Sequence, residues 1–440
     1  MITSREVARR VLSRVAEGSY STLALGGELG RSSLSAVDRA FVTELVYGTI
    51  KHRLRLDRAL ASGAPRGLRR LDERVLDALR MAAYQVLFLR VPAHAAVDDC
   101  VGALRRLRGD RLGGFANALL RRMAERGEPP LPSEGDLRLR LEIEFSAPRW
   151  LVDHALEHFG EDEAREFLSA VNRPPPLWLR TNRLRTDRES LRARLAGERP
   201  HAEIGTSLLA PEAIALRQAG DITRLGSFGE GWCTVQDLAA QLVARLAAPQ
   251  PDERLLDACA GVGGKATHLA ELAGGRALID AADRSETKLA LAQDSAHRLG
   301  VTIRTIACDL TDSGIADLAP TYDCVLLDAP CSGLGVLRRH PEGKWRHSPE
   351  RIVELSGLQA RLLAALAPRV RRGGRLVYSV CTYTEKEGPA QIAALLADGE
   401  FHIEVATSIP TEVLAPDGSL RTWPHRHDAD AFYAVRLRKR

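Results

Sequence analysis

The chain has 440 residues, more than one ordinary hydrophobic core holds, so two or three domains are predicted. Hydrophobic residues make up 45% and charged residues 27%, which is typical of a soluble globular protein, and no apolar run is long enough to span a bilayer. The net charge of +5 is uneven, because residues 1–146 hold 25 Arg and Lys against 18 Asp and Glu. A basic front segment is typical of an RNA-binding appendage, although an arginine-rich helical surface gives the same excess.

The N-terminal residues and the cysteines indicate the cellular compartment in which the protein is expected. Residues 1–15 contain scattered arginines and lack the apolar region and cleavage site of a signal peptide. No two of the seven cysteines form a CxxC pair, so neither a disulfide framework nor a tetrathiolate zinc site is predicted, and no metal is expected. We therefore expect reduced thiols in the cytoplasm.

Residues 1–145 have the apolar spacing of helices. The segment 74–89 is apolar nearly all round, which predicts the central helix of a small bundle. Further helices are predicted at 6–18, at 38–60 from a cap at Asp38, at 94–107 and at 113–126. The stretch 127–136, rich in Pro and Gly, predicts a break after the bundle.

Residues 146–240 predict a small mixed α+β domain, with a helix that begins near Pro148 and an extended basic segment after the prolines at 174–176. From 241 to 440, short apolar runs alternate with amphipathic helices, which predicts an α/β fold with a parallel, doubly wound sheet. The predicted strands are 254–259, 277–283, 303–309, 322–330 and 375–382, with late candidates at 401–406 and 431–438.

A glycine-rich turn follows the first of these strands in the sequence DACAGVGGKATHL. Such a turn lets the backbone approach a ligand, but NAD, FAD and S-adenosylmethionine sites all use one. Four successive strands also end in aspartate, at Asp257, Asp283, Asp309 and Asp328. Carboxylates suit an adenosine ligand with a cationic sulfonium and an amino-acid tail, whereas Asp283 or Asp309 alone could be a cap or turn residue.

Two cysteines, Cys331 and Cys381, follow neighbouring predicted strands at the sheet edge where open α/β sheets bind ligands. A thiolate that adds to carbon 6 of a cytosine makes carbon 5 enamine-like, so that carbon 5 can accept a methyl group. A base then removes the carbon-5 proton and the thiol is eliminated, which is covalent catalysis. The pattern does not decide which cysteine would act.

Three segments resemble the motifs of the Sun-type RNA cytosine-5 methyltransferases: DACAGVGGKATHL, DAPCSGLGVLRRHPEGKWR and YSVCTYTEKEG. The N-terminal third, with HAAVDDCV and FANALLRR, resembles a NusB-type RNA-binding domain. This pairing is characteristic of the RsmB group, and the resemblance covers essentially the whole chain. It implies a NusB-like domain over 1–145, a linker domain over 146–240 and a Rossmann-like methyltransferase domain over 241–440.

The resemblance implies a role for particular residues. Cys381 matches the nucleophile, and Cys331 matches the cysteine implicated in product release. Asp328 and Lys265 match the contacts to the target cytosine. DNA cytosine methyltransferases instead use as nucleophile the cysteine that corresponds to Cys331. The positions that surround S-adenosylmethionine match Cys259, Ala260, Gly261, Val262, Gly263, Gly264, Lys265, Asp283, Asp309 and Asp328. The implied substrate is a cytosine of 16S ribosomal RNA, free or in an early precursor, and the implied enzyme is a monomer.

This sequence departs from the family pattern in three places. Gly261-Val262 replaces the usual Ala-Pro, Gly388 follows Glu387 where the family has Asn, and Ala431 replaces a Gly. None of these changes removes a reacting group.

The target base must leave its stack, so an RNA loop is the expected substrate. We expect phosphate contacts from Arg338, Arg339, Lys344, Arg346, Arg180, Asn182 and Arg183, unless these side chains instead pair with acids of the protein. Trp345 could stack on a base or anchor its loop in a core.

Other functions remain open at this point. The same chemistry could act on tRNA or 23S ribosomal RNA, and the first domain alone would suit a non-catalytic RNA-binding factor. A dinucleotide-dependent oxidoreductase is disfavoured by the imperfect GxGxxG spacing of GVGGKA.

Overall fold

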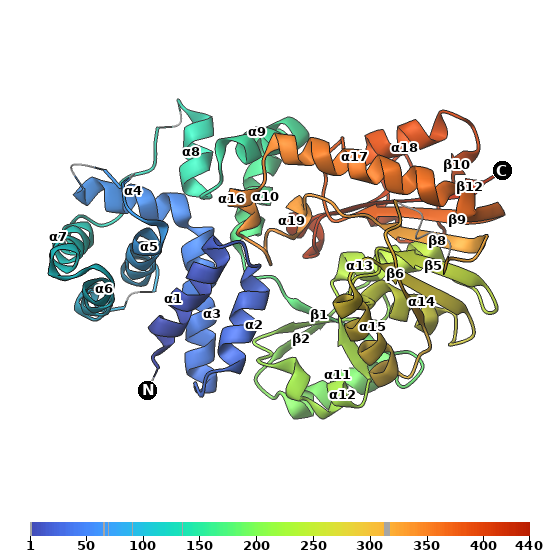
Figure 1. Ribbon diagram of the computed structural model, residues 1–440, viewed down its shortest axis with the longest axis horizontal. Helices are drawn as coiled ribbons and strands as arrows, with labels where there is room; N and C mark the ends of the chain where they lie inside the picture. The colour runs from blue at the N-terminus through green and yellow to red at the C-terminus, as the bar shows by residue number, and fades with distance from the viewer. Residues whose placement is uncertain (1, 65–66, 69, 90, 134, 312–316) are drawn as a thin grey trace. The chain divides into compact units, whose positions relative to one another are not determined.

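A computed structural model of the chain describes residues 2–64, 67–68, 70–89, 91–133, 135–311 and 317–440 (Figure 1). The chain forms two compact units, Met1–Pro174 with Leu337–Arg346, and Pro175–Val336 with His347–Arg440. None of the helices within the described ranges is both long and apolar enough to cross a membrane. The boundaries at 145 and 240 stay a prediction.

The first unit consists of helices, and those up to residue 126 share one apolar core. Helix α5 (Glu73–Leu87) contacts α1, α3, α4, α6 and α7, so the prediction of a central helix is confirmed. The other helices are α1 (Ser4–Ala16), α2 (Ser21–Gly30), α3 (Ala36–Lys51), α4 (Arg53–Gly63), α6 (Ala93–Arg108), α7 (Asp110–Arg126), α8 (Leu137–Glu144), α9 (Arg149–Phe159), α10 (Glu161–Asn172) and the short α16 (Gly343–Arg346).

The single helix predicted over 38–60 from a cap at Asp38 is two helices in the structure, and the first of them begins before Asp38. Ser35 caps α3, and its hydroxyl oxygen accepts a hydrogen bond from the Asp38 backbone N–H at 3.2 Å. The Asp38 carboxylate in turn accepts the Ser35 hydroxyl at 2.7 Å, so the acid lies in the first turn, where the helix dipole favours it. The pattern then breaks at His52, between α3 and α4.

The second unit contains a small antiparallel sheet with strand order β2-β3-β1-β4. Leu179 and Ile214 of this sheet pack with Leu191 and Leu195 of a helix in a separate apolar cluster. The elements are β1 (Leu177–Thr181), α11 (Arg188–Glu198), β2 (Glu203–Thr206), β3 (Ala213–Arg217), α12 (Gly226–Gly229) and β4 (Cys233–Val235).

The second sheet has eight strands, in the order β10-β12-β9-β8-β5-β6-β7, with β11 paired to β12. Strands β5 to β9 are parallel, and β10, β11 and β12 add antiparallel pairs at one side. The strands are β5 (Arg254–Ala258), β6 (Leu278–Asp283), β7 (Arg304–Ala307), β8 (Tyr322–Asp328), β9 (Val370–Val380), β10 (Phe401–Ile403), β11 (Leu420–Thr422) and β12 (Phe432–Lys439). All seven strand segments predicted beyond residue 241 are confirmed.

Helices cover both faces of this sheet (Figure 1). One face packs against α13 (Leu238–Ala247), α14 (Gly264–Leu272) and α15 (Glu286–Leu299). The opposite face packs against α17 (Pro349–Leu366) and α18 (Pro389–Leu396), and the short α19 (Pro424–His427) precedes the last strand. The predicted α/β, Rossmann-like fold is therefore confirmed.

Candidate active site

The strand order reverses between β5 and β8, which lie side by side with β6 on one flank and β9 on the other. In open α/β sheets, ligands bind at the carboxyl ends of the strands at such a switch point. Asp257 lies near the end of β5, Asp328 ends β8, and Cys381 directly follows β9. The fold thus brings together three of the predicted strand-end residues.

The turn from β5 into α14 contains three residues with positive φ. The values are 61° at Cys259, 57° at Gly261 and 77° at Gly263. A Cβ built at position 263 would lie 2.6 Å from the Ala292 Cβ, so this position also needs glycine for close packing on α15. The first backbone N–H groups of a helix lack carbonyl partners within that helix, and the cap residue Gly263 offers no side chain, so the start of α14 is suited to an anionic or polar ligand.

Asp283 holds this turn from the end of β6. Its carboxylate accepts the Gly261 N–H at 2.9 Å through Oδ2 and the Ser285 N–H at 2.9 Å through Oδ1. The residue is buried, and each oxygen retains a lone pair that could accept a hydroxyl. The cap of α15 is Ser285, so Asp283 is not the cap of that helix.

Asp309 lies two residues beyond β7 on the surface. Its Oδ1 accepts the Thr311 N–H at 2.9 Å and the Thr311 hydroxyl at 2.7 Å, which is the hydrogen bonding of a turn residue. These bonds lower the pKa of the carboxyl. Its Oδ2 is not used in this turn, so an adenine contact at this position stays a prediction.

Asp257 has a different environment, because it is fully buried beneath the turn. Neither carboxylate oxygen has a hydrogen-bond partner among the described residues. Burial raises the pKa of Asp257 to about 7, although the nearby positive charge of Lys265 opposes this shift.

Lys265 and Asp328 form an ion pair, with Nζ 2.5 Å from Oδ2. The other Asp328 oxygen accepts the hydroxyl of Ser379 at 2.7 Å, and these two residues lie opposite each other in the β8–β9 register. Burial would lower the pKa of Lys265, but the charge and hydrogen bond of Asp328 and the charges of Asp257 and Cys381 outweigh it and raise that pKa. The sequence reasoning missed Ser379, although its place in YSVC two residues before Cys381 could have indicated it.

The two cysteines lie in contact, with their sulfur atoms 3.3 Å apart. Close loop packing makes this possible: the Gly335 N–H donates to the Cys381 carbonyl at 3.0 Å, and a Cβ at Gly335 would lie 1.8 Å from the Ala431 carbonyl oxygen. Both thiols are partly exposed. The pKa of Cys331 is raised well above the usual range, first by its hydrogen bond to Cys381 and then by burial.

The other five cysteines differ from this pair. Cys100, Cys233, Cys308 and Cys324 are buried, which fits the alternative of structural thiols, and Cys259 is half-buried in the glycine turn. Burial raises the pKa of Cys324 to about 11.

Gly388, where the family pattern has Asn, packs against Tyr433. A Cβ at this position would lie 3.0 Å from two carbon atoms of the Tyr433 ring. The glycine thus leaves space for the aromatic ring of Tyr433, which belongs to β12, beside the loop that follows Cys381.

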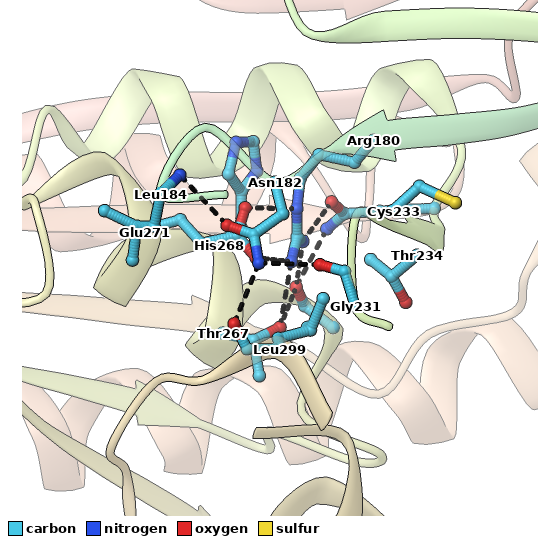
Figure 2. Close-up of polar contacts among 12 residues, drawn as sticks. Arg180, Asn182, Leu184, Gly231, Cys233, Thr234, Thr267, His268, Glu271 and Leu299 are labelled. Carbon is cyan, nitrogen blue, oxygen red and sulfur yellow. Dashed lines mark hydrogen bonds and ion pairs between the residues drawn. The ribbon is translucent and has the colours of Figure 1, made fainter. Parts of the chain in front are cut away.

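Arg180 and Asn182 are buried, so their side chains are not available to an RNA phosphate (Figure 2). The Arg180 guanidinium donates to both oxygens of Glu271, at 2.7 and 3.1 Å. It also donates to Gln236 at 2.6 Å, to the Gly264 carbonyl at 2.8 Å and to Thr267 at 3.1 Å. All five N–H groups of this arginine are therefore used inside the protein.

Asn182 joins two backbone segments from distant parts of the chain. Its Nδ2 donates to the Gly231 carbonyl at 2.9 Å and to the Leu299 carbonyl at 2.8 Å (Figure 2). The predicted RNA contacts of Arg180 and Asn182 are thus replaced by contacts between the small sheet and α14 and α15. Arg183 is exposed, and its RNA contact stays a prediction.

The basic residues after Cys331 belong to the helical unit, and Lys344 is fully buried there. Its ammonium donates to the carbonyls of Lys51 at 2.9 Å and Ser146 at 2.8 Å and to Asn172 Oδ1 at 3.1 Å. Burial lowers the pKa of Lys344 well below its usual range. A lysine in this setting anchors a loop and does not reach an RNA phosphate.

Two neighbours of Lys344 also serve the helical unit. Arg346 donates to the carbonyls of Ser19 at 2.7 Å and Gly18 at 3.2 Å, which follow the end of α1. The Trp345 indole donates to the Ile50 carbonyl at 3.1 Å and packs on the apolar core, so it anchors its loop.

The remaining two arginines of this segment differ in burial. Arg338 is buried and donates to the Pro174 carbonyl at 3.4 Å, and Arg339 is half-buried. The predicted phosphate contacts of the basic residues beyond Cys331 therefore do not fit Arg338 or Lys344, and that of Arg339 stays a prediction.

Comparisons with known proteins cover the whole chain. Residues 244–438 match the family described as 16S rRNA methyltransferase RsmB/F, residues 2–125 match the NusB family, and residues 147–223 match the ferredoxin-like domain of the RsmF/B-like methyltransferases.

Two curated relatives are full-length matches. The probable ribosomal RNA small subunit methyltransferase B of Synechocystis is 36% identical over 100% of both chains. The protein of the same name from Bacillus subtilis is 33% identical over 99% of this chain and 98% of its own length. The crystal structure of PH0851 has a TM-score of 0.85 at 27% identity, and the match covers 100% of this chain and 99% of that one. The chain therefore belongs to the ribosomal RNA small subunit methyltransferase B family, with a NusB-like helical region ahead of the RsmB/F methyltransferase fold.

Proposed function

We propose that this protein transfers a methyl group from S-adenosylmethionine to carbon 5 of a cytosine in 16S ribosomal RNA, through a covalent adduct between Cys381 and carbon 6. The observation that carries the proposal is the contact of two thiols at 3.3 Å beside the Lys265–Asp328 ion pair, at the switch point of the sheet. The family supports methyl transfer to small-subunit ribosomal RNA.

The residues around the β5–α14 turn fit S-adenosylmethionine. Positive φ at Cys259, Gly261 and Gly263 opens the turn to close approach by a ligand. Asp283 has lone pairs left for ribose hydroxyls, and the two oxygens of Asp257 lack partners that a ligand ammonium or a water molecule could supply. When bound, S-adenosylmethionine supplies an electrophilic methyl group on a cationic sulfur.

Cys381 is the proposed nucleophile. Its thiolate forms a bond to carbon 6 of the cytosine, and the electron pair of the carbon 5–carbon 6 double bond moves so that carbon 5 becomes nucleophilic. Carbon 5 then takes the methyl group from the sulfonium, whose sulfur keeps the electron pair of the broken carbon–sulfur bond and leaves as a neutral thioether. A base removes the carbon-5 proton, the double bond re-forms and the Cys381–carbon 6 bond breaks, which returns the thiolate.

Lys265 and Asp328 are the proposed contacts to the cytosine ring. Addition at carbon 6 places electron density on the ring nitrogen and oxygen, where a proton or a cation stabilises it. The ion pair offers both a carboxyl group that can share a proton with the ring nitrogen and an ammonium next to it, and Ser379 fixes the carboxylate orientation.

Cys331 is the proposed release residue. Its raised pKa means that it holds its proton at neutral pH, which disfavours nucleophilic attack by this thiol. The alternative assignment has Cys331 as the nucleophile, as in DNA enzymes, and the raised pKa of that thiol counts against it.

The proposed substrate is free 16S ribosomal RNA or an early precursor, because the target base must be unstacked to reach a thiol inside the site. We further propose that the enzyme acts as a monomer, which sedimentation of the active protein measures directly.

The test compares wild type, Cys381→Ala and Cys331→Ala with S-adenosylmethionine and 16S ribosomal RNA. Denaturing gels detect covalent protein–RNA adducts, and the RNA is mapped for 5-methylcytosine. We expect no mark with Cys381→Ala and a trapped adduct with Cys331→Ala. The reverse pattern would make Cys331 the nucleophile, and methylation of tRNA or 23S RNA instead would change the substrate.

A further inference from the structure

A buried carboxylate, Glu387, lies between the two cysteine loops and has no part in the proposed reaction steps. The residue is fully buried, and four donors converge on its two oxygens. Oε1 accepts the Ser332 N–H at 2.7 Å and the Gln359 amide at 3.3 Å. Oε2 accepts the hydroxyls of Ser332 at 2.6 Å and Thr384 at 2.8 Å. This is the arrangement of an ionised carboxylate, which only accepts hydrogen bonds.

These bonds connect the residue after one cysteine with the loop after the other. Ser332 follows Cys331, and its hydroxyl also lies 3.0 Å from the hydroxyl of Thr382, which follows Cys381. Because Ser332 donates to Glu387, it accepts from Thr382 in this pair. The carboxylate therefore links both loops through Ser332, whose hydroxyl contacts Thr382, and these two residues each stand one position after a cysteine.

Further contacts hold Glu387 itself in place. Its carbonyl accepts the hydroxyl of Tyr378, from inside β9, at 2.6 Å. Gln359 of α17, besides its bond to Glu387, donates to the Pro330 carbonyl at 2.9 Å, just before Cys331. The carboxylate is thus fixed to the sheet on one side and to the Cys331 loop on the other.

We propose that Glu387 is a positioning residue that fixes Cys331 against Cys381 and thereby assigns release to Cys331 and attack to Cys381. The inference rests on the proposed function, since it explains how two adjacent thiols acquire different tasks. Glu387 acts through its neighbours and does not touch the reacting atoms.

The charge of Glu387 supports the same assignment. A buried carboxylate near a thiol opposes the formation of a second negative charge, so Glu387 contributes to the raised pKa of Cys331, after the hydrogen bond to Cys381, burial and the charge of Cys381. The positive charge of Lys265, in contrast, interacts with Cys381. The neighbouring charged groups therefore differ: Glu387 lies near Cys331, and Lys265, which is paired with Asp328, lies near Cys381.

The first test uses the free enzyme and needs neither RNA nor S-adenosylmethionine. Wild type and Glu387→Gln are treated with iodoacetamide across a pH series, and alkylation at Cys331 and Cys381 is read by peptide mass spectrometry. Loss of the charge should raise the ratio of Cys331 to Cys381 alkylation at neutral pH about tenfold, the change that one pKa unit produces.

Glu253→Gln is the matched control, because Glu253 is a largely buried carboxylate paired with Arg375 Nη2 at 2.5 Å, ahead of β5 and away from the carboxyl ends of the strands. This variant should leave the alkylation ratio unchanged. Thr384→Val removes the hydroxyl that donates to the Glu387 carboxylate at 2.8 Å and accepts the Glu387 N–H at 3.3 Å, and it keeps the charge. It should raise the ratio less than Glu387→Gln does, and it still tests the proposal if Glu387→Gln fails to fold.

The second test follows covalent adducts in methylation reactions. Glu387→Gln should accumulate the Cys381 adduct, as Cys331→Ala does, while the first methyl transfer slows less than adduct release. A merely structural role would lower both steps together with the melting temperature.

The outcomes separate this inference from the proposed function. An unchanged alkylation ratio in Glu387→Gln and Thr384→Val, with normal adduct release, overturns the role of Glu387 even if Cys381 methylates RNA. A changed ratio without any methylation by wild type would support the positioning of the thiols and refute the proposed reaction.

Discussion

The buried ion pair between Arg180 and Glu271 gives the sharpest prediction about how the small sheet is attached to α14, the helix that follows the glycine-rich β5–α14 turn. Replacing Arg180 with Met keeps an unbranched apolar stem and removes the guanidinium with all five hydrogen bonds. Glu271 then remains buried without its cation, and the Gly264 carbonyl loses one of its three side-chain donors, since Gln236 at 3.1 Å and the Thr267 hydroxyl at 3.2 Å still donate to it.

The expected loss is large because neither partner of the pair reaches water. The exposed fractions of the two side chains are 0% and 2%. Breaking a buried pair on one side destabilises a protein by about 3–5 kcal/mol, whereas replacing both partners by apolar groups is often neutral. We therefore expect Arg180→Met to lower local stability by about 4 kcal/mol and the double variant Arg180→Met/Glu271→Leu to recover most of this loss.

The burial of Glu271 also gives this prediction a pH dependence. Burial already raises the pKa of Glu271 against the opposing charge of Arg180. Without the arginine that pKa rises further, so Arg180→Met should be least stable at high pH and recover as the carboxyl is protonated at lower pH.

Amide hydrogen exchange in β1 and α14 measures this local free energy directly, and calorimetric titration with S-adenosylmethionine measures the effect on the turn. Arg192→Met is the matched control, because Arg192 is an exposed arginine of α11 that pairs with Glu189 at 3.3 Å and should contribute less than about 1 kcal/mol. A loss below about 1 kcal/mol in Arg180→Met, or a double variant as unstable as the sum of the single ones, would refute the reasoning.

Three further predictions test other parts of the structure. Asp257→Asn should be more stable than wild type at pH 8 but not at pH 4, because the buried carboxyl has a pKa of about 7. Three pKa units at about 1.36 kcal/mol each give a gain of up to about 4 kcal/mol, to be read from denaturant unfolding at both pH values. Gly263→Ala should weaken S-adenosylmethionine binding at least about tenfold by calorimetry, since position 263 has φ of 77° and a Cβ there would lie 2.6 Å from the Ala292 Cβ. Arg183→Ala should weaken RNA binding and reduce its salt dependence by about one phosphate contact, whereas Lys344→Met should lower the melting temperature of the helical unit and leave the salt dependence unchanged.

The sequence predicted the large sheet well because its strands are short apolar runs that end in functional side chains. Parallel strands bring their carboxyl ends to one edge, so Asp257, Asp328 and Cys381 could be placed together without knowledge of the register. The strand order itself, and with it the antiparallel addition of β12 beside β9, depends on pairing between distant segments that no local pattern encodes.

The basic residues were harder to interpret because charge alone does not distinguish an exposed side chain from a buried one. Arg180 and Lys344 have polar neighbours in the sequence, but their partners lie far along the chain, at Glu271 and at the carbonyl of Lys51. A buried cation needs several such acceptors at once, and these meet only after folding.

For the two cysteines, the local sequence predicts where they lie, but folding decides which groups surround them. Their positions after β8 and β9 could be predicted, and the parallel pairing of these strands then brings the loops together, so that the sulfur atoms come within 3.3 Å. Identical thiols in contact can differ in function only through their surroundings, here Lys265 near Cys381 and Glu387 near Cys331. Glu387 stands six residues after Cys381 in sequence yet hydrogen-bonds to Ser332, beside the other cysteine. Its role therefore follows from the way the two loops close on each other, and only the folded structure contains that information.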